Sequence, residues 1–159
     1  MKNAARKVKA KHVVPASFAP FGRVVTRPAG TPTSEGPDYR FWSDLADYSI
    51  DGETEIGICA VYKQPRRQVA GIERHLRTPE ILIPIDAPFI LPVAREEDPG
   101  AIEAFRVNVG EVVVINKAVW HGPCLPVGKK RSTYFVIFRK NTPHEDVQKQ
   151  SIPPVEIAP

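Results

Sequence analysis

The chain has 159 residues, with few cysteines and no long apolar run. Its two cysteines, Cys59 and Cys124, provide neither a disulfide framework nor a zinc-type CxxC pair. A reducing cytoplasm is therefore the expected location. No apolar run approaches the roughly 18 residues needed to cross a bilayer, and the N-terminus lacks the apolar stretch of a secretory signal. We expect a cytoplasmic protein with no membrane partner.

Acidic residues are missing before Glu35, although the formal net charge of the chain is +4. Basic residues crowd the first eleven positions, namely Lys2, Arg6, Lys7, Lys9 and Lys11. This composition predicts a flexible, solvated basic tail over residues 1–11. No aromatic platform or recognised nucleic-acid motif accompanies these charges, so we expect no nucleic-acid partner.

Helical periodicity is scarce, and the 17 prolines suit short strands because proline breaks helix interiors. About eight short apolar runs, separated by turn signals, predict an all-β fold with few short helices. We expect an antiparallel β-barrel or jelly roll that forms one domain over residues 12–155. In the predicted strand 55–62, Ile56, Ile58, Ala60 and Tyr62 share a face that we expect in the core. The polar, proline-rich segment 143–159 should wrap the outside or hang free.

Two carboxylates and two imidazoles come from three segments of this predicted barrel. Glu73 and His75 lie two residues apart in a predicted strand and so point the same way. Glu80 begins the next apolar run, and His121 follows a later one. This set suits a divalent ion such as Mn, Ni, Fe or Zn, and a small barrel would leave coordination positions open for a substrate. The alternative is a metal-free cluster in which the imidazoles bond to the carboxylates.

The spacing of these residues resembles the two sequence motifs of the cupin family. Gly110 precedes His121 at the spacing of the second motif. Glu73, His75 and Glu80 fit the first motif, with Glu73 in place of its first histidine. The resemblance implies a cupin-type barrel over the predicted domain.

Local stretches are similar to one cupin family in particular, the ureidoglycolate lyases. The matching segments are Phe18-Ala19-Pro20-Phe21-Gly22, Glu73-Arg74-His75, Ile83-Pro84-Ile85, Ala104-Phe105, Val119-Trp120-His121 and Phe135-Val136-Ile137-Phe138-Arg139. The chain carries Glu80 where this family usually has glutamine, and an added carboxylate raises cation affinity. The resemblance implies cleavage of ureidoglycolate to glyoxylate and urea in allantoin and purine breakdown, by a homodimer.

Such a cleavage needs a base for the C2 hydroxyl proton, an acid for the departing urea nitrogen and an anchor for the substrate carboxylate. We expect His75, His121 and Glu73 to share the acid and base roles. Arg40, Lys117 or a metal held by Glu73, His75, Glu80 and His121 could bind the carboxylate, with Tyr62 at the rim as a further substrate contact.

Two other functions fit the same residues. One is a metal-dependent cupin that acts on another small hydroxy or keto acid. The other is a cupin that binds a small anion without catalysis.

Overall fold

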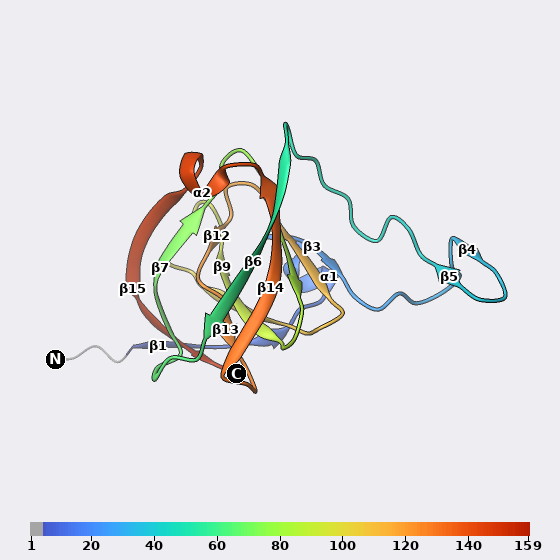
Figure 1. The fold of residues 1–159 in the computed structure, drawn as a ribbon. Coiled ribbons are helices and arrows are strands. Elements are labelled where there is room, and N and C mark those ends of the chain that lie inside the picture. The colour runs from blue at the N-terminus through green and yellow to red at the C-terminus, as the bar shows by residue number, and fades with distance from the viewer. Residues whose placement is uncertain (1–4) are drawn as a thin grey trace.

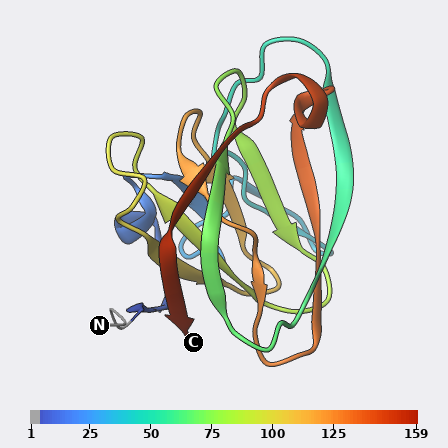
Figure 2. The ribbon, with the colours of Figure 1, turned by 90° about the vertical axis from the view of Figure 1, so that its left-hand side faces the viewer.

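A computed structural model describes residues 5–159 and shows two sheets that face each other and close into a barrel (Figures 1 and 2). The larger sheet contains β1 (Arg6–Lys9), β2 (Lys11–His12), β7 (Gln68–Arg74), β9 (Phe89–Ala94), β10 (Glu103–Val107), β12 (Trp120–His121), β13 (Leu125–Pro126) and β15 (Gln148–Ala158). The smaller sheet contains β3 (Gly22–Val25), β6 (Thr54–Tyr62), β8 (Glu80–Pro84), β11 (Val112–Ile115) and β14 (Arg131–Arg139). The helices are α1 (Pro15–Phe18) and α2 (Thr142–Glu145). The predicted all-β, cupin-type barrel with few short helices is confirmed.

The strand order places segments that are distant in sequence side by side. The larger sheet runs β1-β15-β7-β12-β9-β10-β2, with β13 also paired to β9. The smaller sheet runs β3-β11-β8-β14-β6, so β14 is a central strand and β6 is an edge. No helix in residues 5–159 combines the length and apolar character needed to cross a membrane.

An aromatic cluster forms part of the buried core of the barrel. The Phe105 ring lies 5.1 Å from that of Phe18 and 5.7 Å from that of Phe21, both in edge-to-face contact. All three side chains are fully buried. Burial of these three phenyl rings contributes to the apolar stabilisation of the barrel.

The prediction of a flexible tail is wrong for residues 6–11, whereas residues 1–4 lie outside the described part. Strand β1 pairs in parallel with β15, and β2 pairs in parallel with β10. Val8 and Ala10 pack against an apolar cluster, and the Lys11 ammonium lies 2.7 Å from the Glu103 carboxylate. Alternation of small apolar residues between the lysines makes this a strand despite its charge.

The C-terminal segment is also an integral part of the barrel. Strand β15 is eleven residues long and pairs with β7 on one side and, through Val155–Ala158, with β1 on the other; its pairing with β7 shifts register between Ser151 and Val155. The barrel therefore extends from residue 6 to residue 158, beyond the predicted boundaries of 12 and 155.

The predicted inner face of strand 55–62 proves to be its outer face. Ile56, Ile58 and Tyr62 are 70%, 67% and 60% exposed, whereas Cys59 and Val61 pack against the core. Both faces of this strand are apolar, so alternation alone did not identify the buried one.

Between β3 and β6 the chain leaves the barrel as an extended arm (Figure 1). A small hairpin of β4 (Ser34–Glu35) and β5 (Arg40–Phe41) forms its far end. The arm carries the exposed side chains of Tyr39, Phe41 and Tyr48.

Gly22 fixes the distance between β3 and β11. A Cβ atom at this position would overlap the Val114 carbonyl group of the paired strand. We expect Gly22→Ala to lower the free energy of unfolding by about 2–3 kcal/mol, because the two backbones must separate. Urea denaturation followed by circular dichroism measures this loss.

Gly57→Ala is the matched control, since a Cβ on this β6 residue meets no atom within 4 Å. A loss at Gly22 no greater than the loss at Gly57 would contradict the close approach of β3 and β11.

Candidate active site

The four residues singled out in the sequence meet at one end of the barrel. Glu73 and His121 are direct partners between β7 and β12. Glu80 is the first residue of β8 in the opposite sheet, and His75 follows the end of β7. Because partners in adjacent strands point to the same side, the pairing directs Glu73 and His121 toward Glu80.

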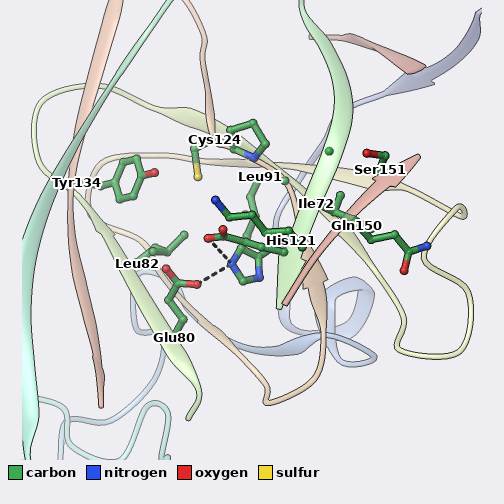
Figure 3. A pocket seen from close by; sticks show the side chains of 14 residues that line it. Ile72, Glu80, Leu82, Leu91, His121, Cys124, Tyr134, Gln150 and Ser151 are labelled. Carbon is green, nitrogen blue, oxygen red and sulfur yellow. Dashed lines mark ion pairs between the residues drawn. The ribbon is translucent and has the colours of Figure 1, made fainter. Parts of the chain in front are cut away.

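Glu80 lies between the two imidazoles. Its Oε2 atom is 2.9 Å from His121 Nε2 and 3.4 Å from His75 Nε2. The Oε1 atom of Glu73 is 3.8 Å from the same His121 Nε2 atom. Figure 3 shows two ion pairs that meet at the same ring nitrogen of His121, one of them from the carboxylate of Glu80. His75, His121 and Glu80 are shielded from solvent, whereas the Glu73 side chain is 40% exposed.

Backbone carbonyl groups orient both rings. His75 Nδ1 lies 2.7 Å from the Asp146 carbonyl oxygen, and His121 Nδ1 lies 3.4 Å from that of Val119. Since a carbonyl oxygen can only accept, Nδ1 carries a proton in both rings, and in a neutral ring the Nε2 lone pair faces Glu80. The Asp146 carboxylate accepts hydrogen bonds from the backbone N–H groups of Leu76 and Arg77, which holds the turn after His75.

The charges in this cluster depend on one another. Burial alone would lower the pKa of His121, but the Glu80 and Glu73 carboxylates outweigh it and raise this pKa to about 10. Burial alone would raise the pKa of Glu80, but the two imidazoles hold it well below its usual range. The neighbouring His121 imidazole also lowers the pKa of Glu73. Burial opposes protonation of His75 too, yet Glu80 raises its pKa. At neutral pH the cluster thus holds two carboxylates and an imidazolium at His121.

The same atoms fit a divalent cation. Ligand atoms of Glu73, His75 and His121 all lie within 4.8 Å of one another. His75 Nε2, Glu80 Oε2 and His121 Nε2 are buried and make no well-aligned hydrogen bond, although Glu80 is within ion-pair distance of both rings. Because buried polar atoms are rarely left unsatisfied, converging nitrogen and oxygen donors of this kind are suited to an ion such as Zn, Ni, Mn or Fe.

A cavity of about 430 Å³ opens beside the cluster. Glu73, Glu80 and His121 line its inner end, and His75 lies behind them, away from the cavity wall. Its other walls include the side chains of Leu82, Leu91, Cys124 and Tyr134 (Figure 3). Lys149, Gln150 and Ser151 of β15 also line it. Burial raises the pKa of the Cys124 thiol, which therefore stays protonated and is a weak nucleophile.

The predicted substrate contacts do not line this cavity. Arg40 lies in the hairpin of the arm, 3.4 Å from the Glu35 carboxylate. Lys117 borders a separate groove with Arg23 and Asp47, and Tyr62 is exposed on the outer face of β6. The structure thus does not bring these three side chains to the cavity.

Sequence reasoning missed Lys149 and Tyr134 as cavity-lining residues. A signal for Tyr134 lies in the apolar run 133–139, which belongs to the central strand β14. No comparable signal marked Lys149, because its segment was expected to lie outside the barrel.

The sequence of this chain is similar to those of ureidoglycolate lyases. A protein-family model described as ureidoglycolate lyase matches residues 5–158. A ureidoglycolate lyase of Chelativorans sp. (strain BNC1) is 30% identical over 140 residues, which cover 82% of this chain and 84% of that protein. One of Burkholderia mallei (strain NCTC 10229) is 29% identical over 147 residues, covering 87% and 85%.

Solved structures with a related shape are more distant. The formate complex of Lactobacillus farciminis oxalate decarboxylase aligns with a TM-score of 0.47 and 13% identity, over 63% of this chain and 27% of that one. The vicilin of Solanum melongena aligns with a TM-score of 0.45 and 12% identity, over 62% and 25%.

The ion pairs of Glu80 predict a characteristic pH dependence of stability in chelator-treated protein. The raised pKa of His121 stabilises the fold fully below its ordinary value of 6.5, and this contribution is lost as pH rises through about 10. The lowered pKa of Glu80 stabilises the fold above its ordinary value of 4.5, and this contribution is lost at lower pH. We expect Glu80→Gln to lower the free energy of unfolding by about 3 kcal/mol between pH 4.5 and pH 6.5, and by less toward pH 10.

Urea denaturation across this pH range measures the difference between wild type and variant. Glu53→Gln removes a carboxylate whose ion pair with Lys140 is exposed, so its effect should stay within about 0.5 kcal/mol. A Glu80→Gln effect that does not change with pH would show that the carboxylate does not stabilise a protonated His121.

Proposed function

Because the chain belongs to the ureidoglycolate lyase family, we propose that it cleaves ureidoglycolate to glyoxylate and urea. The observation that carries the proposal is the match to this family over residues 5–158, together with Glu73 and His121 paired on a cavity wall. That pair supplies an ionised carboxylate and a protonated imidazole 3.8 Å apart.

In this proposal Glu73 is the base. Its carboxylate is ionised and is the most exposed of the cluster, so it can accept the C2 hydroxyl proton of a substrate in the cavity. The C2–O bond then becomes the aldehyde carbonyl of glyoxylate while the C2–N bond breaks. The electron pair of that bond moves to the urea nitrogen, which takes a proton from His121 Nε2. Transfer of the proton from Glu73 to His121 restores the starting state.

We also propose that Glu73, His75, Glu80 and His121 hold a divalent metal ion. Such an ion would act as a Lewis acid that lowers the pKa of the substrate hydroxyl. His121 Nε2 would then be a ligand and could not donate a proton. The Glu73 oxygen that does not bind the ion would take the hydroxyl proton and return it to the urea nitrogen. The carbonyl groups of Asp146 and Val119 fix both rings in the orientation this requires.

Both cysteines are free, which suits a reducing compartment. We therefore propose that the enzyme works in the cytoplasm. Its proposed reaction belongs to allantoin and purine breakdown.

Removing the base or its imidazole partner should abolish most of the activity. We expect Glu73→Gln and His121→Asn each to lower kcat for ureidoglycolate by about 10²- to 10⁴-fold, the usual contribution of a general acid or base. Release of glyoxylate and urea by chelator-treated protein, before and after addition of Mn, Ni, Fe or Zn ions, measures the activity.

Glu53→Gln, on the outer surface, should keep wild-type activity. Activity that vanishes on chelation and returns with one ion supports the metal site, whereas activity unaffected by chelation supports His121 as the acid. Folded wild-type protein that releases no glyoxylate with any of the four ions would refute the proposed reaction.

We further propose that the protein is a homodimer that buries the outer face of β6 and β14. Ile58 and Phe135 are partners on this face, and Ile56 and Tyr62 extend it along β6. The free edge of β6 adjoins this face, and exposed apolar edge strands are usually covered by a partner. A second copy supplies an identical complementary face, as in most two-fold dimers.

Ile58→Glu should convert the dimer to a monomer, because it places two charges in the buried interface. Light scattering at micromolar concentration measures the mass. Val109→Glu changes an equally apolar exposed residue in the turn between β10 and β11 and should leave the dimer intact. A monomeric wild-type protein would contradict the proposal.

A further inference from the structure

The cavity has acidic groups at its inner end, yet the proposed substrate is itself an anion. Glu73 and Glu80 both line this end, and only His121 among the lining groups there can offset them. Arg40 and Lys117 do not line this cavity. A second cationic group is needed to bind a carboxylate in this cavity.

Lys149 is the one lysine or arginine among the described residues that line the cavity. It lies on β15 directly opposite Glu73 of β7. Cross-strand partners project from the same face of a sheet, so the Lys149 side chain extends on the cavity side, as Glu73 does. Figure 3 shows β15 passing along the cavity at the neighbouring residues Gln150 and Ser151.

The Lys149 ammonium is available to a ligand. The ion pairs in the described part of the chain do not include it, although Glu73 is its strand partner. Lys149 is exposed at the mouth of the cavity, so its ammonium group can bind an anion without first moving out of a buried position.

The position of Lys149 is tied to the catalytic cluster. Three residues earlier, the Asp146 carbonyl group accepts the His75 hydrogen bond, and the Asp146 carboxylate holds the turn after β7. From Gln148 to Ser151, consecutive pairs join β15 to β7. The backbone of Lys149 is thus fixed relative to Glu73.

We propose that Lys149 is a positioning residue that binds the carboxylate of small α-hydroxy and α-keto acids at the mouth of the cavity. The inference rests on the proposed function for the identity of the substrate, ureidoglycolate, and of its product, glyoxylate. A carboxylate held by Lys149 directs the adjacent C2 hydroxyl inward, toward Glu73. Lys149 contributes binding and orientation, and no proton in the reaction passes through it.

The test combines steady-state kinetics with calorimetric titration of glyoxylate and of urea, which carries no charge. Lys149→Gln should raise KM for ureidoglycolate about tenfold while kcat stays within twofold, because the contact is made equally in substrate and transition state. Its affinity for glyoxylate should fall about tenfold, with urea binding unchanged. Lys149→Arg should retain most of the affinity, and Lys140→Gln, which removes an exposed lysine paired with Glu53, should match wild type.

The outcomes separate this inference from the proposed reaction. If wild type turns over ureidoglycolate and Lys149→Gln has an unchanged KM, the assignment of Lys149 is wrong. A fall in kcat at constant KM would also overturn it, since Lys149 would then act on Glu73 instead of on the substrate. If wild type binds glyoxylate through Lys149 but releases none from ureidoglycolate, Lys149 is an anion-binding residue and the proposed reaction fails.

Discussion

The buried carboxylate of Glu80 is the constraint on which the site depends. A carboxylate removed from water is stable only if cations or hydrogen-bond donors surround it. His121 and His75 meet that need, and each ring is held from behind by a backbone carbonyl group. The contacts that stabilise the Glu80 carboxylate therefore also fix the rings of His75 and His121. The pairing of β7 with β12 then places Glu73 beside His121.

The barrel is the means by which these contacts form. Glu80 comes from one sheet and His121 from the other, so the cluster exists only when the two sheets close on each other. Gly22 allows β3 and β11 to approach, and the phenyl rings of Phe18, Phe21 and Phe105 are buried in the interior. In the cavity, apolar walls that include Leu82 and Leu91 meet the charged cluster.

The sequence predicted the fold class and the convergence of Glu73, His75, Glu80 and His121, because period-two apolar runs and fixed spacing are local signals. It did not predict which face of β6 is buried, since Ile56 and Ile58 are as apolar as the inward residues. Nor could it place the basic N-terminal segment, whose strand pairs with β15, more than 140 residues later. Long-range pairing of this kind leaves no local pattern. The same limit explains why Arg40 and Lys117 were chosen as substrate contacts and Lys149 was not.

The arrangement of charged groups along the cavity favours one orientation of the substrate. At its inner end the Glu80 carboxylate is matched by the imidazolium of His121, so the Glu73 carboxylate carries the excess negative charge of the cluster. At its mouth the Lys149 ammonium faces solvent opposite Glu73. An entering hydroxy acid therefore has its carboxylate attracted to the mouth, while its hydroxyl can donate to Glu73. The reactive carbon lies between these two groups, which is where a base must act if the C–N bond is to break.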